Sequence, residues 1–259
     1  MNFDIGDIVT RKSHNNDIVF KIISINNNIV FLKGVDLRIY ADAFIDDLIK
    51  TSNNDNNDEI IIQENLRNIS FDRDSYFYLP GKILHIDGDN EYLDRCMNLY
   101  KRLGIKANGI TINENSIKKK IYDLLNEYKP DVLVITGHDA FYNKNDNKSD
   151  LNNYLNSKNF ILAIKEARKY ERNQDKLIIV AGACQSDYEE LIKAGANFAS
   201  SPKRINIHAL DPAIIASSIA FSDRNQSIDL LNLIKKTKYG SDGIGGIITN
   251  GTMYVGFPR

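Results

Sequence analysis

Short apolar runs separated by polar turns make up the N-terminal part of the chain. The runs cover residues 7–11, 18–23 and 29–33, and the turns between them are rich in Asn and Ser. β-Branched and aromatic runs bounded by turn residues are typical of strands. Residues 41–48 can add a further strand that closes the unit. The pattern therefore predicts a small β-barrel of the SH3 type over residues 1–50.

The next stretch, residues 51–79, begins with a polar tract. Residues 51–59 consist only of Thr, Ser, Asn, Asp and Glu. A tract with so few apolar side chains cannot offset the conformational entropy that is lost when it becomes ordered. We therefore expect residues 51–79 to form a linker, or a flexible loop that is open to proteolysis.

From residue 80 onward, apolar runs alternate with amphipathic segments. The apolar runs predicted as strands are residues 82–87, 105–112, 131–136, 177–181 and 197–200. The amphipathic segments predicted as helices are residues 91–103, 116–128, 159–170 and 188–194. Strands that are apolar throughout and alternate with helices indicate a parallel sheet covered on both faces. The sequence thus predicts a doubly wound, mostly parallel α/β domain over residues 80–259.

Turn residues mark the ends of several of these elements. Gly104 and Gly195 directly follow predicted helices, where glycine accepts the left-handed conformation that ends a helix. Beyond Asp211 we expect one or two further helices. Glycine-rich turns over residues 243–246 and a hairpin centred on residues 250–251 then complete the chain.

Composition and charge exclude several classes of protein. The chain has 259 residues, with 33 Lys and Arg against 34 Asp and Glu and a formal net charge of -1. This balance gives no electrostatic reason to expect binding to nucleic acid or to a membrane surface. No apolar run approaches the roughly 18 residues of a membrane span, and the N-terminus lacks the basic and apolar regions of a signal peptide. We therefore expect a cytoplasmic protein, and the sequence indicates no oligomeric state.

The two cysteines differ in their setting. Two thiols are too few for a disulfide framework or a four-thiolate zinc site, and we expect neither a metal nor an organic cofactor. Cys96 falls inside an amphipathic helix, where it is expected to pack in the core. Cys184 instead follows an apolar run and two small residues, at the carboxyl end of a predicted strand. In open parallel sheets, active sites lie beyond these strand ends.

His138 follows the preceding predicted strand in the same manner. If the two strands are neighbours, His138 and Cys184 emerge at the same edge of the sheet. A thiol needs a base or a cationic partner to become a thiolate at neutral pH, and a nearby imidazole supplies one. For either residue alone a structural role is the simpler interpretation, because a lone buried cysteine is most often a small core residue.

Small residues around these two side chains fit a site for acyl transfer. Gly182 and Ala183 leave room for a substrate backbone to approach the thiol. The backbone N–H of Cys184 and one near Gly137 or Asp139 would then point toward a developing oxyanion.

This arrangement resembles that of the caspase-like (clan CD) cysteine peptidases. In their signature, one apolar strand leads into a histidine followed by Gly, and a second apolar strand ends in a small residue followed by Cys. Here Cys184 follows Ala183, and its distance in sequence from His138 is close to the roughly 50 residues found in caspases. The residue after the histidine is Asp139 and not Gly, which departs from the pattern and weakens the oxyanion assignment on that side.

Longer segments resemble the YabG family of sporulation-specific proteases of spore-forming Firmicutes. These segments are residues 33–36, 84–89, 135–140, 181–186 and 199–210, and the likeness runs from about Ile5 to the last glycine-rich segment. The resemblance implies a cysteine endopeptidase that processes spore coat and cortex-associated proteins and cleaves at basic residues, chiefly Arg. It places the enzyme in the mother cell during sporulation, in its cytoplasm and at the forming spore coat. Cys184 is then the nucleophile and His138 its base.

Recognition of arginine calls for a carboxylate, because a guanidinium pairs best with a planar acceptor. Asp211, Asp187 and Asp242 are the acids that we expect near the site, with Asp211 ranked first because it follows the loop after the fifth strand. Each of them can instead be a solvated loop acid or a helix cap. Asp211 followed by Pro212 is also the pattern of a helix N-cap with proline in the first turn.

Two alternatives remain open at this point. His208 could pair with Cys184 in an amidotransferase-type hydrolase, although a nucleophile elbow would have Gly at the position of Ser186. Asp87 and Asp89, after the first strand of the α/β region, could bind Mg²⁺ as in receiver-type domains, which would make the protein a non-catalytic regulatory module. The same two acids can also simply cap the helix that follows them.

Overall fold

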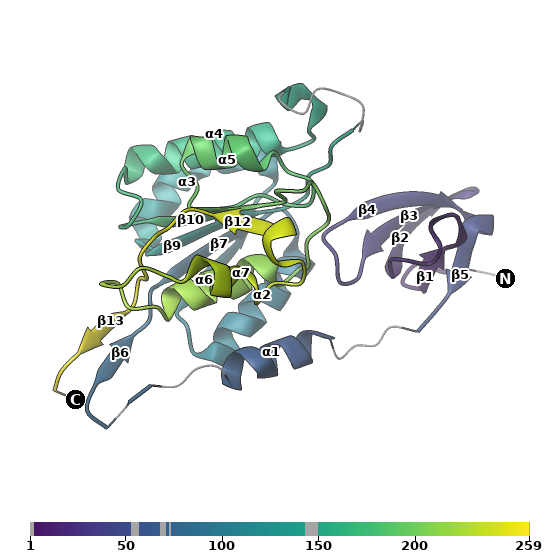
Figure 1. The fold of residues 1–259 in the computed structure, drawn as a ribbon. Helices are drawn as coiled ribbons and strands as arrows, with labels where there is room; N and C mark the ends of the chain where they lie inside the picture. Colours follow the sequence, from purple (N-terminus) through teal and green to yellow (C-terminus); the bar gives the residue numbers. More distant parts are fainter. Residues whose placement is uncertain (1–2, 53–56, 68–70, 73, 143–149, 259) are drawn as a thin grey trace.

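The computed structural model describes residues 3–52, 57–67, 71–72, 74–142 and 150–258 of the chain. Two sheets of different kind lie side by side, and a short two-stranded ribbon projects from the larger one (Figure 1). No helix in these described ranges is long and apolar enough to cross a membrane.

The N-terminal unit is a five-stranded antiparallel sheet in the order β4-β3-β2-β1-β5. Its strands are β1 (Ile8–Arg11), β2 (Phe20–Asn26), β3 (Ile29–Gly34), β4 (Tyr40–Phe44) and β5 (Leu48–Lys50). The predicted strands are therefore present, but the short 3-10 helix η2 (Ile45–Asp47) divides the last predicted segment into β4 and β5. A small apolar cluster, which includes Phe20 and Leu32, forms the core of this unit.

The second sheet has six strands in the order β12-β11-β10-β9-β7-β8. Its strands are β7 (Ile83–Asp87), β8 (Ala107–Thr111), β9 (Val132–Thr136), β10 (Ile178–Ala181), β11 (Phe198–Ser200) and β12 (Ile244–Gly246). All neighbours are parallel except β11 and β12. The chain reverses its direction of winding between β7 and β9, and the crevice beyond such a switch point is where open α/β sheets bind ligands.

Helices cover both faces of this sheet (Figure 1). One face carries α3 (Glu114–Tyr128), α4 (Ser157–Tyr170) and α5 (Tyr188–Ala194), and the other carries α1 (Asn57–Arg67), α2 (Asn90–Leu103), α6 (Asp211–Ala220) and α7 (Leu230–Ile234). Strand β9 shows how the two layers form. Val132 and Val134 belong to the core on one face, and Leu133 and Ile135 to the core on the other. A strand buried on both faces needs apolar side chains at every position, and this explains its uninterrupted apolar run.

Local signals set the ends of several helices as the sequence predicts. Asp89 is the N-cap of α2 and accepts the backbone N–H groups of Glu91 and Tyr92. Gly104 and Gly195 end α2 and α5 with φ values of 73° and 113°. Both values lie in the left-handed region, which glycine adopts without steric cost.

Two expectations were wrong in part. The stretch 51–79 contains α1 and the strand β6 (Phe77–Leu79), so it is more than a linker, although residues 53–56 of its polar tract lie outside the described ranges. The chain also forms no hairpin centred on residues 250–251. Strand β12 pairs with β11 instead, and β13 (Tyr254–Gly256) pairs with β6. Tertiary pairing thus overrides the local turn signal of Asn and Gly.

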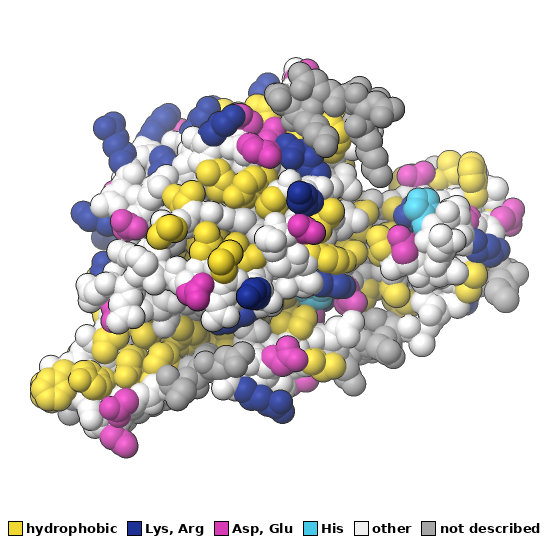
Figure 2. Space-filling view, viewed as in Figure 1, with side chains coloured by type: hydrophobic (Ala, Val, Ile, Leu, Met, Phe, Trp, Pro, Cys, Tyr) yellow, Lys and Arg dark blue, Asp and Glu magenta, His cyan; other side chains and the backbone are white. Residues whose placement is uncertain are grey.

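Basic and acidic side chains are interspersed over the face seen in Figure 2. Apolar side chains gather at the ribbon formed by β6 and β13, where Leu79 is 57% exposed and Tyr254 is 50% exposed. The interspersed charges agree with the near-neutral net charge of the chain.

Candidate active site at the carboxyl edge of the parallel sheet

Three adjacent strands deliver polar side chains to one edge of the sheet. β7 ends at Asp87, β9 leads to His138 and β10 leads to Cys184. β9 pairs in parallel with both β7 and β10. The predicted neighbourhood of the strands that precede His138 and Cys184 is therefore confirmed.

The thiol of Cys184 is buried beneath the segment that follows β11. Its side chain is 1% exposed, and its sulfur accepts the backbone N–H of Ile207 at 3.2 Å. Burial raises the pKa of the Cys184 thiol to about 12, which hydrogen bonding from Ile207 only partly opposes. A thiol with this pKa is protonated at neutral pH, so the sulfur must be uncovered before it can act as a nucleophile.

The imidazole of His138 is held by a carboxylate from β7's loop. Its Nε2 lies 3.0 Å from Oδ2 of Asp89, whereas its buried Nδ1 has no hydrogen-bond partner among the described residues. Asp89 also accepts from Lys33 and from the Tyr40 hydroxyl, each at 2.8 Å. A carboxylate at Nε2 places the ring proton on that nitrogen, which leaves the lone pair of Nδ1 available as a base.

Cys184 and His138 both border Tyr92 of α2. The His138 and Tyr92 ring centroids are 5.8 Å apart. The pKa of Tyr92 lies above its ordinary value, chiefly because of burial, with Asp89 and Cys184 among the smaller causes. Across the ranges that the structure describes, no hydrogen bond joins His138 to Cys184. The structure thus brings the pair to one edge of the sheet without forming the catalytic contact.

Backbone amides near the thiol differ in their availability. The N–H of Ala183 donates to the Ser186 hydroxyl at 2.9 Å, and the N–H of His138 donates to Oε1 of Glu114 at 2.8 Å. For the N–H groups of Cys184 and Asp139, no acceptor is found in the described part of the chain. In the described residues these two N–H groups thus lack the kind of hydrogen bond that occupies the amides of Ala183 and His138.

Asp139 is a structural acid and not a group open to substrate. It is 7% exposed, and its carboxylate accepts from the backbone N–H of Asn156 at 2.7 Å and from the hydroxyls of Ser157 at 2.5 Å and Ser186 at 2.8 Å. Burial raises the pKa of Asp139, and these hydrogen bonds oppose the rise. Because Ser186 also receives the N–H of Ala183, Asp139 ties the loop of the histidine to the loop of the cysteine.

Glu114, the first residue of α3, is a site residue that the sequence did not reveal. A Cβ added to Gly137 would lie 2.3 Å from Oε1 of Glu114, and a Cβ added to Gly88 would lie 2.2 Å from the same oxygen. Both positions therefore require glycine while Glu114 binds the amide of His138. In the sequence, Glu114 looked like an ordinary acidic residue in the first turn of a helix.

His208, the alternative base, lies on the segment that covers the thiol. It is 2% exposed, and its Nδ1 accepts the N–H of Leu210 at 3.2 Å. Burial, together with the charge of Arg95, lowers the pKa of His208 to about 4. No hydrogen bond between His208 and Cys184 occurs in the described residues. With Nδ1 committed to the backbone, His208 is less suited than His138 to accept the thiol proton.

Of the three acids expected to bind a basic side chain, Asp211 and Asp187 make hydrogen bonds within this chain, and Asp242 lies on the surface. Asp211 is buried at the first residue of α6, where it accepts the N–H groups of His208 and Lys238 at 3.0 Å each. Leu210 is the N-cap of that helix, so Asp211 lies one position further in than expected. Asp187 caps α5 and contacts Arg204 at 3.4 Å. Asp242 is exposed on the short 3-10 helix η4 (Gly240–Asp242).

A buried arginine–aspartate pair was not anticipated from the sequence. Arg38, from the loop between β3 and β4, places Nη1 2.6 Å from Oδ2 of Asp87, and both side chains are fully buried. Burial alone would lower the pKa of Arg38 and raise that of Asp87. The pair's mutual attraction outweighs it, raising the pKa of Arg38 and lowering that of Asp87.

The carboxylates of Asp87 and Asp89, at the end of β7, thus both form hydrogen bonds and ion pairs within this chain. Asp87 binds Arg38, and Asp89 caps α2 while it binds Lys33, Tyr40 and His138. The helix-capping role expected of Asp89 is confirmed, and a receiver-type role gains no support from these contacts. The described residues contain no group of three or more His, Cys, Asp or Glu side chains placed to hold a metal ion.

Comparison with known proteins agrees with these observations. The chain matches the family described as YabG peptidase U57 over residues 4–258. It is 40% identical to the sporulation-specific protease YabG of Bacillus subtilis (strain 168), in an alignment that covers 100% of this chain and 99% of that protein. The chain therefore belongs to the YabG family of sporulation peptidases.

Proposed function

We propose that this peptidase is a cysteine endopeptidase with Cys184 as its nucleophile and His138 as its general base. Two observations carry the proposal. The residues follow adjacent parallel strands, and in the part of the chain that the structure describes Nδ1 of His138 has no partner while Asp89 binds Nε2. That combination leaves a nitrogen of the imidazole with a lone pair available as a base, at the sheet edge to which β10 also leads Cys184.

In the proposed reaction, Nδ1 of His138 accepts the thiol proton and the sulfur of Cys184 attacks the carbonyl carbon of the substrate. The N–H groups of Cys184 and Asp139 stabilise the negative charge that develops on the carbonyl oxygen. The imidazolium returns its proton to the leaving amine, and water then hydrolyses the acyl-enzyme. Asp89 stabilises the imidazolium by its charge, as the third member of a catalytic triad does.

We further propose spore coat and cortex-associated proteins as the substrates, with cleavage after Arg. The name of the relative, a sporulation-specific protease, supports a role in sporulation. The choice of these substrates and of Arg is our proposal from the family resemblance. A location in the mother-cell cytoplasm and at the forming coat is consistent with such substrates. The proposal includes a caspase-like arrangement of the α/β domain and an SH3-like character of the N-terminal sheet. Domain limits of 1–50, 51–79 and 80–259 remain predictions.

The test is cleavage of an Arg-containing coat-protein fragment by the full chain and by three variants. Cys184→Ala and His138→Ala are expected to abolish cleavage, whereas His208→Ala should retain it. The same fragment with its arginines replaced by Leu serves as the substrate control. Cleavage that survives Cys184→Ala would falsify the thiol mechanism. Loss in His208→Ala together with activity in His138→Ala would move the base to His208.

A further inference from the structure

A segment of the N-terminal unit lies across the candidate active site as an added strand. Leu37 forms an antiparallel bridge with His208. The N–H of Arg38 donates to the carbonyl of Ile207 at 3.2 Å, and the N–H of Ala209 donates to the carbonyl of Asp36 at 2.9 Å. An extended peptide that pairs with an exposed strand edge while its side chains enter pockets is a common mode of peptide recognition.

The side chain of Arg38 fills a fully enclosed pocket at the end of β7. Asp87 holds Nη1 at 2.6 Å, and the carbonyl of Ala209 accepts from Nε at 3.2 Å and from Nη2 at 3.1 Å. The guanidinium carbon lies 5.1 Å from the centre of the Tyr92 ring. A carboxylate, a carbonyl and an aromatic face together match the planar, charged and multiply donating guanidinium group better than an ammonium group.

The backbone of Arg38 is also adjacent to the candidate nucleophile. The sulfur of Cys184 lies 3.2 Å from the nitrogen and 3.9 Å from the carbonyl oxygen of Ile207. That same carbonyl oxygen accepts the N–H of Arg38 at 3.2 Å. The thiol therefore contacts the backbone of Ile207, with which the main chain of Arg38 pairs, while the side chain of Arg38 is held by Asp87. This is the relationship expected between a cysteine nucleophile and the residue after which the substrate is cut.

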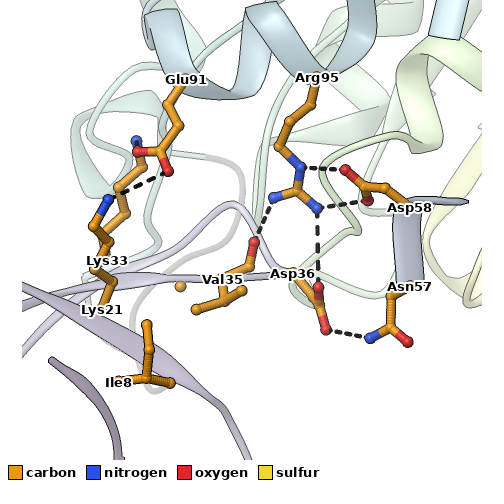
Figure 3. Close-up of a pocket in the computed structure, with 10 residues that line it drawn as sticks. Ile8, Lys21, Lys33, Val35, Asp36, Asn57, Asp58, Glu91 and Arg95 are labelled. Carbon is orange, nitrogen blue, oxygen red and sulfur yellow. Dashed lines mark hydrogen bonds and ion pairs between the residues drawn. The ribbon is translucent and has the colours of Figure 1, made fainter. Parts of the chain in front are cut away.

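Further contacts hold this segment in place. Arg95 of α2 donates to the carbonyl of Val35 at 2.5 Å and forms an ion pair with Asp58 of α1 at 2.6 Å (Figure 3). Gly34 allows the tight turn, because a Cβ there would fall 2.3 Å from the carbonyl oxygen of Leu37. These contacts fix the conformation of the segment, which belongs to the N-terminal unit and contacts the site through residues 36–38.

We propose that residues 36–38 occupy the substrate-binding cleft as an internal peptide, with Arg38 in the pocket that receives the arginine of a substrate and Asp87 as the acid that recognises it. This inference rests on the proposed function, since it takes Cys184 as the nucleophile. The structure is then a closed, inactive form. Activity requires residues 36–38 to leave the cleft, after which the strand edge at residues 207–209 pairs with the substrate instead.

The experiment uses a peptidyl ketone that alkylates cysteine and carries Arg next to the reactive group, with a Leu analogue as the probe control. The rate of labelling at Cys184 is followed by peptide mass mapping, which separates it from Cys96. The proteins are the full-length wild type, Arg38→Ala, the double variant Arg38→Ala/Asp87→Asn, and Arg102→Ala. Arg102 is a matched control, because it pairs with Glu59 on the surface, away from the site.

Arg38→Ala is expected to react with the Arg probe about tenfold to a thousandfold faster than the wild type, since an open state that is populated at about 0.1–10% becomes the main state. The Leu probe should gain much less in the same variant. In the double variant, reaction with the Arg probe should fall to the level of the Leu probe because the acid is gone. Arg102→Ala should match the wild type. A folded Arg38→Ala that gains no rate with the Arg probe overturns the proposal.

A second measurement needs no substitution, so it decides the matter if Arg38→Ala does not fold. Hydrogen exchange is compared in wild-type protein before and after complete labelling by the Arg probe. The N–H of Arg38 is expected to lose its protection on labelling, while amides within β2 and β3 keep theirs. Unchanged protection of residues 36–38 in labelled protein would show that they do not share the cleft with substrate.

Failure of this inference can be distinguished from failure of the proposed function. If Cys184→Ala abolishes cleavage of the coat-protein fragment while Arg38→Ala changes nothing, the cysteine mechanism stands and the internal peptide is rejected. If Cys184→Ala still cleaves the fragment, the proposed function itself is rejected.

Discussion

Oδ2 of Asp89 lies 3.0 Å from Nε2 of His138. In the proposed mechanism this contact orients the imidazole so that Nδ1 can act as the base. An asparagine at position 89 would keep the N-cap of α2 but offer an amide that can donate to Nε2. The ring proton would then move to Nδ1, where it blocks proton transfer from the thiol. We expect Asp89→Asn to lower kcat by about 10²- to 10⁴-fold with a small change in KM, as substitution of the aspartate in a serine-protease triad does.

The measurement for Asp89→Asn is steady-state cleavage of a fluorogenic Arg peptide, with circular dichroism to confirm the fold. Glu91→Gln is the matched control, because Glu91 shares the partner Lys33 with Asp89 but does not contact His138. Glu91→Gln should retain most of the activity. Equal losses in the two variants would indicate that Lys33, and not the orientation of His138, determines the rate.

Asp139 accepts hydrogen bonds from the hydroxyls of Ser157 and Ser186. Replacing either serine by alanine removes the same chemical group, so the effects of the two substitutions on stability and activity can be compared directly. Ser186→Ala removes both the bond to Asp139 and the acceptor of the Ala183 N–H, beside the nucleophile. Ser157→Ala removes a bond to Asp139 and the acceptor of the Asp187 N–H, at the start of α4. Each should lower the free energy of unfolding by about 1–3 kcal/mol, because a buried N–H loses its partner.

Only Ser186→Ala is also expected to lower kcat, by about tenfold to a hundredfold, since a small displacement of reacting groups is costly. Denaturant titration and peptidase assays on both variants check this. Equal activity in the two would mean that Asp139 supports stability alone and does not position the cysteine loop.

The extent to which the site could be predicted differs between its two halves. His138 and Cys184 follow apolar runs, and parallel strands bring their ends to one edge, so a local pattern was enough to place the two strand ends side by side. The contact between Arg38 and Asp87 joins two units far apart in the sequence. Nothing in the turn that holds Arg38 indicates which acid it will meet, because that choice depends on how the two sheets dock.

The same limit explains other differences. Helix α1 follows a polar tract and buries Ile62 as its one fully buried residue, so its pattern is too weak to predict a helix. Strand β13 pairs with β6, a partner at the other end of the α/β region, and no local turn signal encodes such a pairing. The core strands were predictable because burial on both faces requires an apolar side chain at nearly every position, which gives a continuous apolar run in the sequence.

Gly137 and Glu114 allow a test of the loop that carries His138. A methyl group at position 137 would fall 2.3 Å from Oε1 of Glu114, so Gly137→Ala must displace the carboxylate that binds the N–H of His138. We expect Gly137→Ala and Glu114→Ala each to reduce kcat, and the double variant to be hardly worse than Glu114→Ala alone. The coupling should be about 1 kcal/mol or more. Purely additive losses in the fluorogenic peptide assay would show that the two residues act independently.

Asp211 and His208 are bonded neighbours whose ionisation should affect stability in opposite directions. Burial raises the pKa of Asp211 to about 6 from 3.8, so the folded state takes up a proton first as the pH falls, and stability is gained between pH 6 and 4. Burial lowers the pKa of His208 to about 4 from 6.5, so the unfolded state takes up a proton first, and stability is lost as the pH falls from 6.5 to 4. In the wild type the two effects largely offset each other.

Single substitutions should reveal each effect. Asp211→Asn keeps an acceptor oxygen, and relative to the wild type its free energy of unfolding should fall by about 2–3 kcal/mol between pH 6.5 and 4, at 1.36 kcal/mol per pKa unit. His208→Asn keeps an acceptor for the N–H of Leu210, and relative to the wild type it should gain a similar amount over the same range. Urea titrations at half-unit pH intervals measure both differences, and because other acids titrate alike in all three proteins, their contribution cancels. Parallel curves for the three proteins would mean that neither side chain changes its pKa on folding.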